Sequence, residues 1–501
     1  MQTMNRSRLL VSLHALAYCF GSIACSSSEG ERSSMLPSGA AAPVRPATGE
    51  KKDNREPGAG VAPGSGVPAM EGSAPVEVPG ELPLVPEGTN PGPGRTPAEP
   101  PPAVPDEPSA AGPPPFVFDE ENTGADCPAP ALPPFAQLPV IPELPDPFLS
   151  AGGAGITTRA DWRCRRREVA AQIENYEMGE HPGRPSILNA SLQGNVLSIT
   201  AGEAAGTVTL SVTINRPDGA PSGPIPALIG VVSRTGSLPA DIFDSRGVAS
   251  MAFDIQQLAA QFPGRGNQLY NRVFGADTDA GSMIAWAWGI SRVIDALEQV
   301  PEAGIDTSHI AVTGCSFAGK IALYAGALDE RIRLTIPEES GGGGTANWRV
   351  SEDERNQGTD TENLSTAQGT AWYGQNLPQF NAAVDRLPFD HHQVIGMVAP
   401  RALLAIESSS PNFPRLSHVS TFTSGAAAHK IWEALGVPER MGMTQLATNH
   451  CQFPASLRDE VEAFVDRFLL DREGVDTDVL ESDAITPDLA RWAPWPVPTL
   501  E

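Results

Sequence analysis

Residues 309–323 read HIAVTGCSFAGKIAL, and this stretch decides the fold class. A compact apolar run ends at Thr313, a tight turn follows over 314–316, and an apolar helix comes directly after the turn. The pattern predicts a nucleophile elbow, a strained strand–turn–helix in which a serine hydroxyl projects above the edge of a sheet. The helix N-terminus favours negative charge that develops beside the hydroxyl. Ser316 is therefore the candidate nucleophile, although its spacing, GxSxxG, departs from the commoner GxSxG; the alternative is a serine that only caps the turn.

The segments on either side of this stretch predict an α/β fold. Further compact apolar runs, typical of buried parallel strands, lie at 226–232, 247–253, 331–336 and 402–406. At 279–299 apolar residues recur every three to four positions, which predicts an amphipathic helix. Alternating runs at 195–200 and 206–214 predict an antiparallel start to the sheet. Strands that alternate with helices predict a doubly wound, mainly parallel sheet sandwiched by helices, and the elbow makes this an α/β-hydrolase.

The composition divides the chain of 501 residues into unequal parts. Residues 127–472 have the composition of one large α/β-hydrolase domain. Residues 26–126 are rich in Pro, Gly, Ala and Ser and cannot bury enough apolar surface to offset their ordering entropy, which predicts a disordered linker. This linker either acts as a stalk or serves only as a soluble spacer. Residues 473–501 return to a composition rich in Pro and Asp and are expected to form a C-terminal tail.

Residues 1–25 have the plan of a secretory signal peptide. Two arginines precede the apolar run 9–20, which is too short to span a membrane. The end of the segment, SIAC at 22–25, is similar to a bacterial lipoprotein cleavage box, with Ser22 where an aliphatic residue is usual. We therefore expect an exported protein that is either secreted or held at the outer membrane or cell surface by a lipid anchor on Cys25.

The charge of the chain excludes several classes of partner. Lys+Arg 34 against Asp+Glu 60 gives a net charge of −26, which repels the phosphate backbone, so no nucleic-acid partner is expected. Beyond the signal and Cys25, four cysteines remain, an even number that predicts two disulfides in an exported chain, with three pairings possible. These are Cys127, Cys164, Cys315 and Cys451. No Cys/His cluster has the spacing of a structural zinc site, so neither a metal nor a cofactor is expected.

A serine hydroxyl needs a neighbouring base that an acid holds in the right tautomer. His450, in TNHCQFP at 448–454, lies just before a final amphipathic helix, where this fold places its base. Its rivals, expected to be surface or packing residues, are His391, His392, His418 and His429. Two acids compete for the third role: Glu339 follows the strand after the elbow, and Glu407 closes the later strand 402–406. The sequence leaves this choice open.

Five motifs taken together resemble the glucuronoyl esterases of carbohydrate esterase family 15. They are GCSFAGK at 314–320, ESGGGG at 339–344, LPFDHH at 387–392, APRALL at 399–404 and HCQFP at 450–454. The resemblance runs in order over about 127–470, and the combination is specific although no single motif is. It implies hydrolysis of the ester between 4-O-methyl-glucuronic acid on xylan and an alcohol of lignin, with a polysaccharide substrate as partner.

The resemblance also implies the roles of individual residues. Ser316 would be the nucleophile, His450 the base and Glu339 the acid, with Glu407 as the alternative acid. It pairs Cys315 with Cys451, and Cys127 with Cys164. The substrate-binding positions would be Lys320, Glu362 and Phe413, the last of which stands where the family has an aromatic platform, normally Trp.

The main departure from the family is Phe317, which stands where an arginine usually follows the nucleophile. That arginine helps to stabilise the oxyanion, whereas at Phe317 only the backbone N–H can donate. The loss of one oxyanion donor costs about 2.7 to 4 kcal/mol in a well-studied protease. This leaves two further hypotheses open: an esterase for other uronate or acetyl esters, and a weakly catalytic surface lipoprotein that binds glucuronoxylan.

Overall fold

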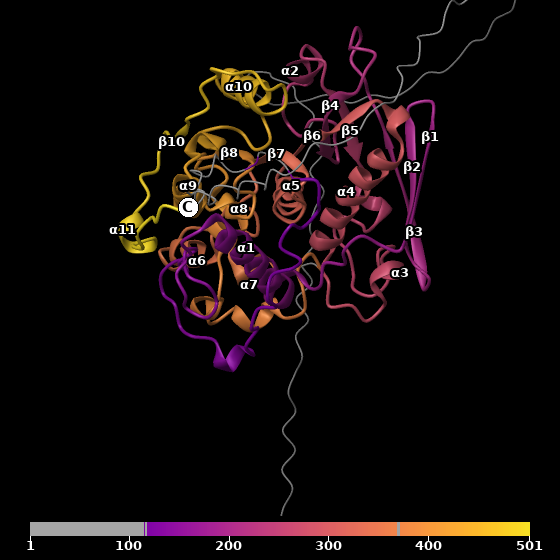
Figure 1. Ribbon diagram of the computed structural model, residues 1–501. Helices are drawn as coiled ribbons and strands as arrows, with labels where there is room; N and C mark the ends of the chain where they lie inside the picture. Colours follow the sequence, from indigo (N-terminus) through magenta and orange to yellow (C-terminus); the bar gives the residue numbers. More distant parts are fainter. Residues whose placement is uncertain (1–114, 116–117, 368–370) are drawn as a thin grey trace, which may run out of the picture. The chain divides into compact units, whose positions relative to one another are not determined.

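The elbow lies within a seven-stranded parallel sheet (Figure 1). The computed structural model describes residues 115, 118–367 and 371–501, so the predicted signal peptide, Cys25 and most of the predicted linker lie outside the described residues. The strands lie in the order β10-β9-β8-β7-β6-β4-β5, and every neighbouring pair is parallel. Their bounds are β4 (Ile225–Val231), β5 (Ala249–Phe253), β6 (Ile305–Cys315), β7 (Ile332–Glu338), β8 (Ala402–Ser408), β9 (Met441–Leu446) and β10 (Leu480–Ser482). The predicted parallel sheet is confirmed.

The carboxyl ends of these strands lie along one edge of the sheet because all neighbours are parallel. Strand β6 ends at Cys315, and in the register of the sheet Glu338 of β7 lies opposite this residue. On the next strand, Ile406 of β8 lies opposite Glu338. The loops that leave this edge are where open α/β sheets bind their ligands. The register therefore brings the ends of three strands together beside Ser316.

Helices cover both faces of the sheet, and alternate residues of a strand enter different cores. Leu228 of β4 packs in one core with Phe243 and Phe464, which come from α2 and α10. Its neighbour Ile229 packs in the other core, together with residues of α4, α5, α8 and α9. The helices are α1 (Arg159–Ile173), α2 (Ala240–Asp244), α3 (Asn271–Phe274), α4 (Ser282–Gln299), α5 (Phe317–Leu328), α6 (Trp348–Asn356), α7 (Leu364–Ala367), α8 (His391–Gly396), α9 (His418–Ala434), α10 (Arg458–Phe468) and α11 (Leu489–Trp492). Within the described part of the chain, none of them is long and apolar enough to cross a membrane.

The strands expected at the start of the main sheet form a sheet of their own. β1 (Ile187–Gln193), β2 (Val196–Glu203) and β3 (Gly206–Thr213) pair antiparallel and lie beside α4 (Figure 1). Among the described residues, an isolated antiparallel bridge between Asn215 and Ser250 joins this region to β5. The turn-forming run RPDGAPSGP after Asn215 separates the two sheets, since proline cannot donate to a ladder. Helix α4 consequently lies between two sheets and is buried on nearly all sides.

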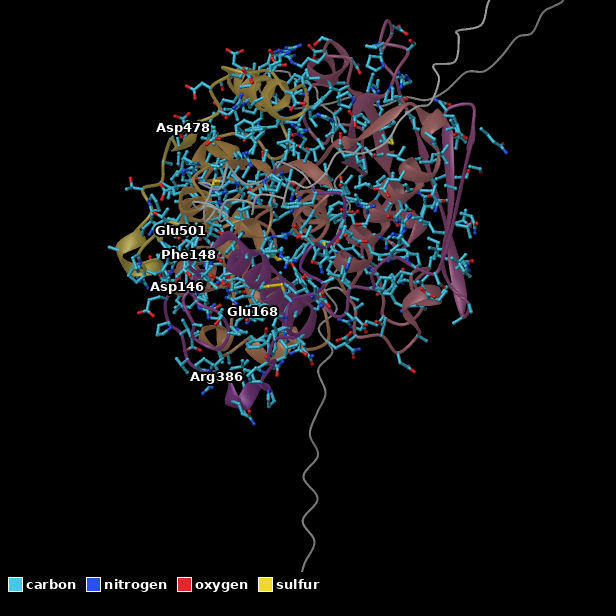
Figure 2. All side chains as sticks on the ribbon, viewed as in Figure 1. Asp146, Phe148, Glu168, Arg386, Asp478 and Glu501 are labelled. Carbon is cyan, nitrogen blue, oxygen red and sulfur yellow. A yellow bond between two sulfur atoms is a disulfide. The ribbon has the colours of Figure 1, made fainter. Side chains whose placement is uncertain are left out.

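The domain is also longer than its composition indicates. The segment 473–501, expected as a tail, contributes β10 to the main sheet and buries Trp492 and Trp495. The Trp495 ring lies edge-on to Phe148, with ring centroids 5.7 Å apart, and Figure 2 labels Phe148 and Glu501 on the same side of the domain. At the other end, Thr123 donates its backbone N–H to Glu330 at 2.9 Å, so the domain begins before residue 127. Burial of Trp492, Trp495 and Leu500 therefore stabilises this segment against the domain despite its prolines.

Replacing Trp495 by alanine tests whether this segment is part of the core. A buried aromatic side chain replaced by alanine costs about 3 to 5 kcal/mol, so Trp495→Ala is expected to lower the free energy of unfolding by this amount. The measurement is chemical denaturation followed by tryptophan fluorescence. Val497→Ala is the matched control, because Val497 is 39% exposed and its loss should change the stability by under about 0.5 kcal/mol. Equal effects of the two substitutions would show that the segment does not pack as described.

Candidate active site

Ser316 stands in the strained turn that the sequence predicts. It links β6 to α5 with φ 61° and ψ −127°, a positive-φ conformation that is rare for a residue other than glycine. Its backbone N–H donates to the carbonyl of Glu338 at 2.9 Å, which ties the turn to β7. A Cβ atom at Gly319 would lie 2.5 Å from the same carbonyl, so glycine is needed where α5 packs against β7. This close approach explains why the second glycine follows the serine by three residues.

His450 and Glu339 form a short hydrogen-bonded pair beside the elbow. The Nδ1 atom of His450 lies 2.6 Å from Oε2 of Glu339. The same Oε2 atom accepts the backbone N–H of Cys451 at 3.0 Å, and Oε1 accepts the Thr448 hydroxyl at 3.3 Å. Glu339 itself has φ 44°, a conformation that turns the carboxylate from the end of β7 toward the loop of His450. A carboxylate at this distance favours the tautomer with the proton on Nδ1, and Nε2 lies 3.8 Å from Sγ of Cys451.

Glu407, the other candidate acid, does not contact His450 in the hydrogen bonds that the structure contains. Its Oε1 atom accepts the Thr345 hydroxyl at 2.5 Å and the Ser340 hydroxyl at 3.2 Å. Burial raises the pKa of Glu407 to about 8. Glu407 is therefore a largely neutral carboxyl group at pH 7 that supports the Gly-rich loop after β7.

A disulfide joins the two halves of the site. Cys315 and Cys451 are bonded, with Cα atoms 5.9 Å apart, so the residue before Ser316 is attached to the residue after His450. The second disulfide joins Cys127 to Cys164 in α1. Both are the pairings that the family resemblance implies. Among the described residues, the one cluster of metal-ligating residue types is Cys315, His450 and Cys451, and its two sulfur atoms are used in the disulfide.

Glu338 points away from this pair and binds the loop after β4. Its carboxylate accepts the backbone N–H of Ser237 at 3.1 Å and the Thr313 hydroxyl at 2.9 Å, and it also accepts the Ser237 hydroxyl. Burial raises the pKa of Glu338 to about 7. In α/β-hydrolases the corresponding loop supplies a backbone donor to the oxyanion. The sequence carried no signal for Ser237 or Thr313 as partners, because the first lies in the loop after β4 and the second on β6, both far along the chain from Glu338.

Lys320 is placed beneath the Gly-rich loop rather than on an open surface. It is buried, and its ammonium donates to the carbonyl of Ser340 at 2.7 Å and to Oε2 of Glu362 at 3.0 Å, and it also donates to the carbonyl of Gly342. These three bonds use all three protons of the ammonium. Lys320 therefore holds Glu362 in position, while a direct contact with a ligand would require one of these bonds to break.

The two phenylalanines singled out from the sequence stack on different aromatic rings. Phe413 is 42% exposed and stacks on the His450 ring, with ring centroids 4.8 Å apart. Phe317, the first residue of α5, is half-buried and stacks instead on Trp372, with centroids 5.9 Å apart. The edge of Trp286 from α4 also meets the Phe317 ring. The position that carries arginine in the family is thus filled here by an aromatic contact.

The four histidines considered as alternatives to His450 form hydrogen bonds elsewhere in the domain. His391 and His392 are fully buried and bond to Glu177 and to the carbonyl of Pro145, respectively. His418 and His429 contact the backbone carbonyls of Phe413 and Met441. None of these four imidazoles shares a hydrogen bond with either candidate acid among the described contacts.

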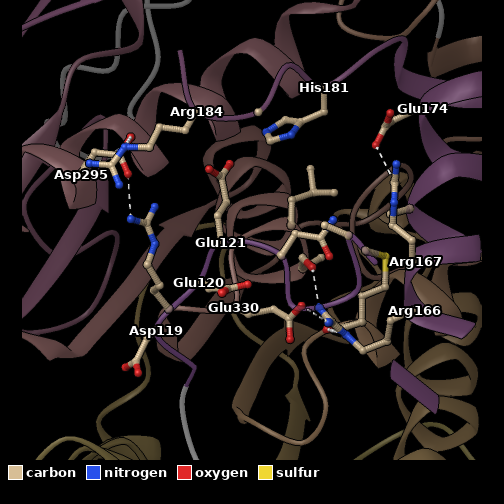
Figure 3. A pocket seen from close by; sticks show the side chains of 18 residues that line it. Asp119, Glu120, Glu121, Arg166, Arg167, Glu174, His181, Arg184, Asp295 and Glu330 are labelled. Atoms are coloured by element: carbon tan, nitrogen blue, oxygen red, sulfur yellow. Dashed lines mark hydrogen bonds and ion pairs between the residues drawn. The ribbon is translucent and has the colours of Figure 1, made fainter. Parts of the chain in front are cut away.

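A cavity of about 450 Å³ lies away from these residues, where the incoming chain crosses the domain (Figure 3). None of the predicted site residues lines it. Its charged side chains are largely paired: Arg166 contacts Glu330 at 2.6 Å, and Arg167 contacts Glu174 at 3.4 Å. Burial lowers the pKa of His181 to about 3, so this imidazole is neutral. The cavity therefore marks where the first described residues attach rather than a second catalytic centre.

Comparison with known proteins gives consistent matches. The family model described as "Glucuronyl esterase, fungi" matches residues 199–436. A 4-O-methyl-glucuronoyl methylesterase from Podospora anserina is 40% identical over 371 residues, 72% of this chain and 76% of the relative. The glucuronoyl esterase catalytic domain from Hypocrea jecorina is 41% identical with a TM-score of 0.70, over 74% of this chain and 100% of that one. A mutant glucuronoyl esterase from Sporotrichum thermophile, in complex with methyl 4-O-methyl-β-D-glucopyranuronate, is 37% identical with a TM-score of 0.68, over 73% and 97% of the two chains.

The α/β-hydrolase sheet and these matches define the protein as a carboxylic ester hydrolase. More particularly, the chain belongs to the glucuronoyl esterase family, as the motifs around Ser316, Glu339 and His450 indicated. The family resemblance read from the sequence is therefore confirmed.

The two disulfides offer a matched test of how the site is held. The double variant Cys315→Ser/Cys451→Ser is expected to lose roughly 2 to 4 kcal/mol of stability and to lower kcat about 10- to 100-fold, because the base can then drift from the hydroxyl. The control, Cys127→Ser/Cys164→Ser, removes a crosslink far from Ser316 and should lower stability with little change in kcat. Differential scanning calorimetry and ester hydrolysis, measured well below both melting temperatures, separate the effects. Equal kcat values in the two double variants would contradict a positioning role.

Proposed function

We propose that this protein hydrolyses the ester between (4-O-methyl-)glucuronic acid of glucuronoxylan and alcohols of lignin. The observation that carries the proposal is the 2.6 Å contact between Glu339 and His450, whose loop is joined to the elbow of Ser316 by the disulfide. It is further supported by a family member that binds methyl 4-O-methyl-β-D-glucopyranuronate. A polysaccharide is therefore the proposed partner.

In the proposed mechanism, Oγ of Ser316 attacks the ester carbonyl carbon while its proton passes to Nε2 of His450. Glu339 holds the proton on Nδ1 and stabilises the imidazolium that forms. The tetrahedral intermediate collapses, and His450 returns the proton to the departing alkoxide. Water, deprotonated by the same histidine, then attacks the acyl carbon. The bond between this carbon and Oγ of Ser316 breaks, His450 returns the proton to Oγ, and glucuronic acid is released.

The oxyanion of the intermediate needs donors other than the missing arginine. We assign the backbone N–H of Phe317, at the N-terminus of α5, to this role. The loop after β4, which Glu338 ties to the sheet through Ser237, is positioned to add a second backbone donor. Because Phe317 has no side-chain donor, the same site is also a candidate for less demanding uronate esters or acetyl esters.

The glucuronate ring is proposed to bind on the side of Glu362 and Phe413. Glu362 is a fixed acceptor for sugar hydroxyls because Lys320 holds its carboxylate at 3.0 Å. The exposed face of Phe413 offers a surface for a sugar ring. The two disulfides fit an exported enzyme, and a lipid anchor on Cys25 stays a prediction for a segment outside the described residues.

The proposal is tested by alcohol release from benzyl glucuronate, with methyl glucuronate and an aryl acetate as comparison substrates. We expect the two glucuronates to be hydrolysed well above the acetate. Ser316→Ala should lower kcat by at least about 10³-fold while the variant still binds the glucuronates, because only the attacking oxygen is lost. Preferred turnover of the acetate would instead support a general esterase. Tight binding of glucuronoxylan fragments with no turnover above that of Ser316→Ala would support the binding lipoprotein.

A pair of isosteric substitutions distinguishes the two candidate acids. Glu339→Gln should lower kcat roughly 10²- to 10⁴-fold, because the amide no longer compensates the imidazolium of His450. Glu407→Gln should change kcat by less than about threefold, because burial raises the pKa of Glu407 to about 8 and an amide resembles its neutral form. Steady-state hydrolysis of methyl glucuronate at pH 7 measures both. The reverse order of effects would make Glu407 the acid of the triad.

A further inference from the structure

Three aromatic rings form a continuous row that begins at the residue after Ser316. The Phe317 ring stacks on Trp372 at 5.9 Å and 22°, and Trp372 stacks on Phe262 at 5.8 Å and 18°. The row thus passes from a half-buried ring to the nearly buried Trp372, 9% exposed, and ends at Phe262, which is 67% exposed. Phe262 is the most exposed large apolar side chain among the described residues.

Hydrogen bonds fix the position of Trp372, the middle ring of the row. The indole N–H of Trp372 donates to the carbonyl of Gln261, the residue next to Phe262. The Trp372 carbonyl accepts the backbone N–H of Met283 at 3.1 Å, at the start of α4. A Cβ atom at Gly281 would lie 2.0 Å from that carbonyl, so glycine is what allows the approach. Trp372 is therefore fixed on both sides, and Phe262 is placed by it.

The exposed end of the row, Phe262, follows a strand on the other side of β6 from the groups proposed to act on the acid half of the ester, while its middle ring, Trp372, belongs to the β7–β8 connection that also carries Glu362. Glu339, Phe413 and His450 follow β7, β8 and β9, which lie on one side of β6. Phe262 follows β5, at the opposite edge of the sheet beyond β4. The acyl and alkoxy halves of an ester leave the reacting carbon in different directions. With the glucuronate on the side of Glu362 and Phe413, the alcohol half is directed toward the row.

The chemistry of the row fits an aromatic group better than a sugar. Sugar subsites pair a stacking ring with side chains that bind hydroxyls, whereas Phe317 and Phe262 have no polar atoms in their side chains. The indole N–H of Trp372 is already used by Gln261. A planar ring, by contrast, continues the offset stacking that the three side chains already make.

We propose that Phe317, Trp372 and Phe262 form a binding surface for an aromatic ring in the alcohol half of the ester. This inference rests on the proposed function and adds to it the residues that recognise the leaving group. Phe317 connects the row to the turn that carries Ser316, because its phenyl ring stacks on Trp372. An arginine at this position would instead place a charged group at this end of the row. The loss of an oxyanion donor is accordingly accompanied by a gain in contact with the leaving alcohol.

The test compares three esters in wild type and Phe262→Ser: benzyl glucuronate, methyl glucuronate and the methyl ester of a glucuronoxylo-oligosaccharide. We expect kcat/KM for the benzyl ester to fall roughly 2- to 12-fold, mainly through KM, and the two methyl esters to change by less than about 1.5-fold. Phe262→Tyr, which keeps the ring, should retain the wild-type preference. Val140→Ser, at a residue that is 52% exposed and far along the chain from the row, is the control for loss of an exposed apolar side chain.

Each other outcome overturns the inference. A selective loss with the oligosaccharide ester would assign the row to xylan, and an unchanged ratio of benzyl to methyl rates would show that the row does not bind the alcohol. Phe262 is exposed and outside the catalytic residues, so its variants are expected to fold. If wild type hydrolyses neither glucuronate ester, the proposed function itself fails, which is a different result from hydrolysis with no dependence on Phe262.

Discussion

The carboxylate of Glu339 is the contact on which the rest of the site depends. Its two oxygens accept the imidazole of His450 at 2.6 Å, the backbone N–H of Cys451 at 3.0 Å and the hydroxyl of Thr448 at 3.3 Å. A buried charge-assisted acceptor of this kind is stable only when its lone pairs are satisfied. The loop of His450 therefore cannot leave β7 without exposing an unpaired carboxylate. The disulfide between Cys315 and Cys451 closes the same loop on the elbow.

Two adjacent glutamates of identical chemistry serve different purposes because the backbone turns between them. Glu338 is the last residue of β7 and points to Ser237 and Thr313, where burial raises its pKa to about 7. Glu339, with φ 44°, faces His450 instead. One side chain ties the loop after β4 to the sheet and the other bonds to the imidazole of His450. The reversal of direction at positive φ, rather than any difference in side chain, separates the partners of the two carboxylates.

The replacement of the family arginine by Phe317 changes how the site is stabilised. An arginine would add a charge next to the developing oxyanion, whereas Phe317 packs between Trp286 and Trp372. Backbone donors at the start of α5 cannot be lost by such a replacement, since every residue except proline carries an N–H. The fold thus tolerates the substitution, and the phenyl ring packs where an arginine side chain would project.

Much of this protein can be predicted from local sequence, because the features involved are local. The apolar run, turn and helix around Ser316 and the parallel strands follow from the order of residues along a few turns of chain. The burial of Trp492 and Trp495, by contrast, depends on surfaces that other segments create. The hydrogen bond that makes Glu339 rather than Glu407 the partner of His450 connects residues 111 positions apart. The acceptors of the Lys320 ammonium likewise lie 20 to 42 positions further along the chain. Sequence alone determined which groups could do chemistry, and only the tertiary structure decided which of them meet, because distances between segments are set by packing and register rather than by any single stretch of chain.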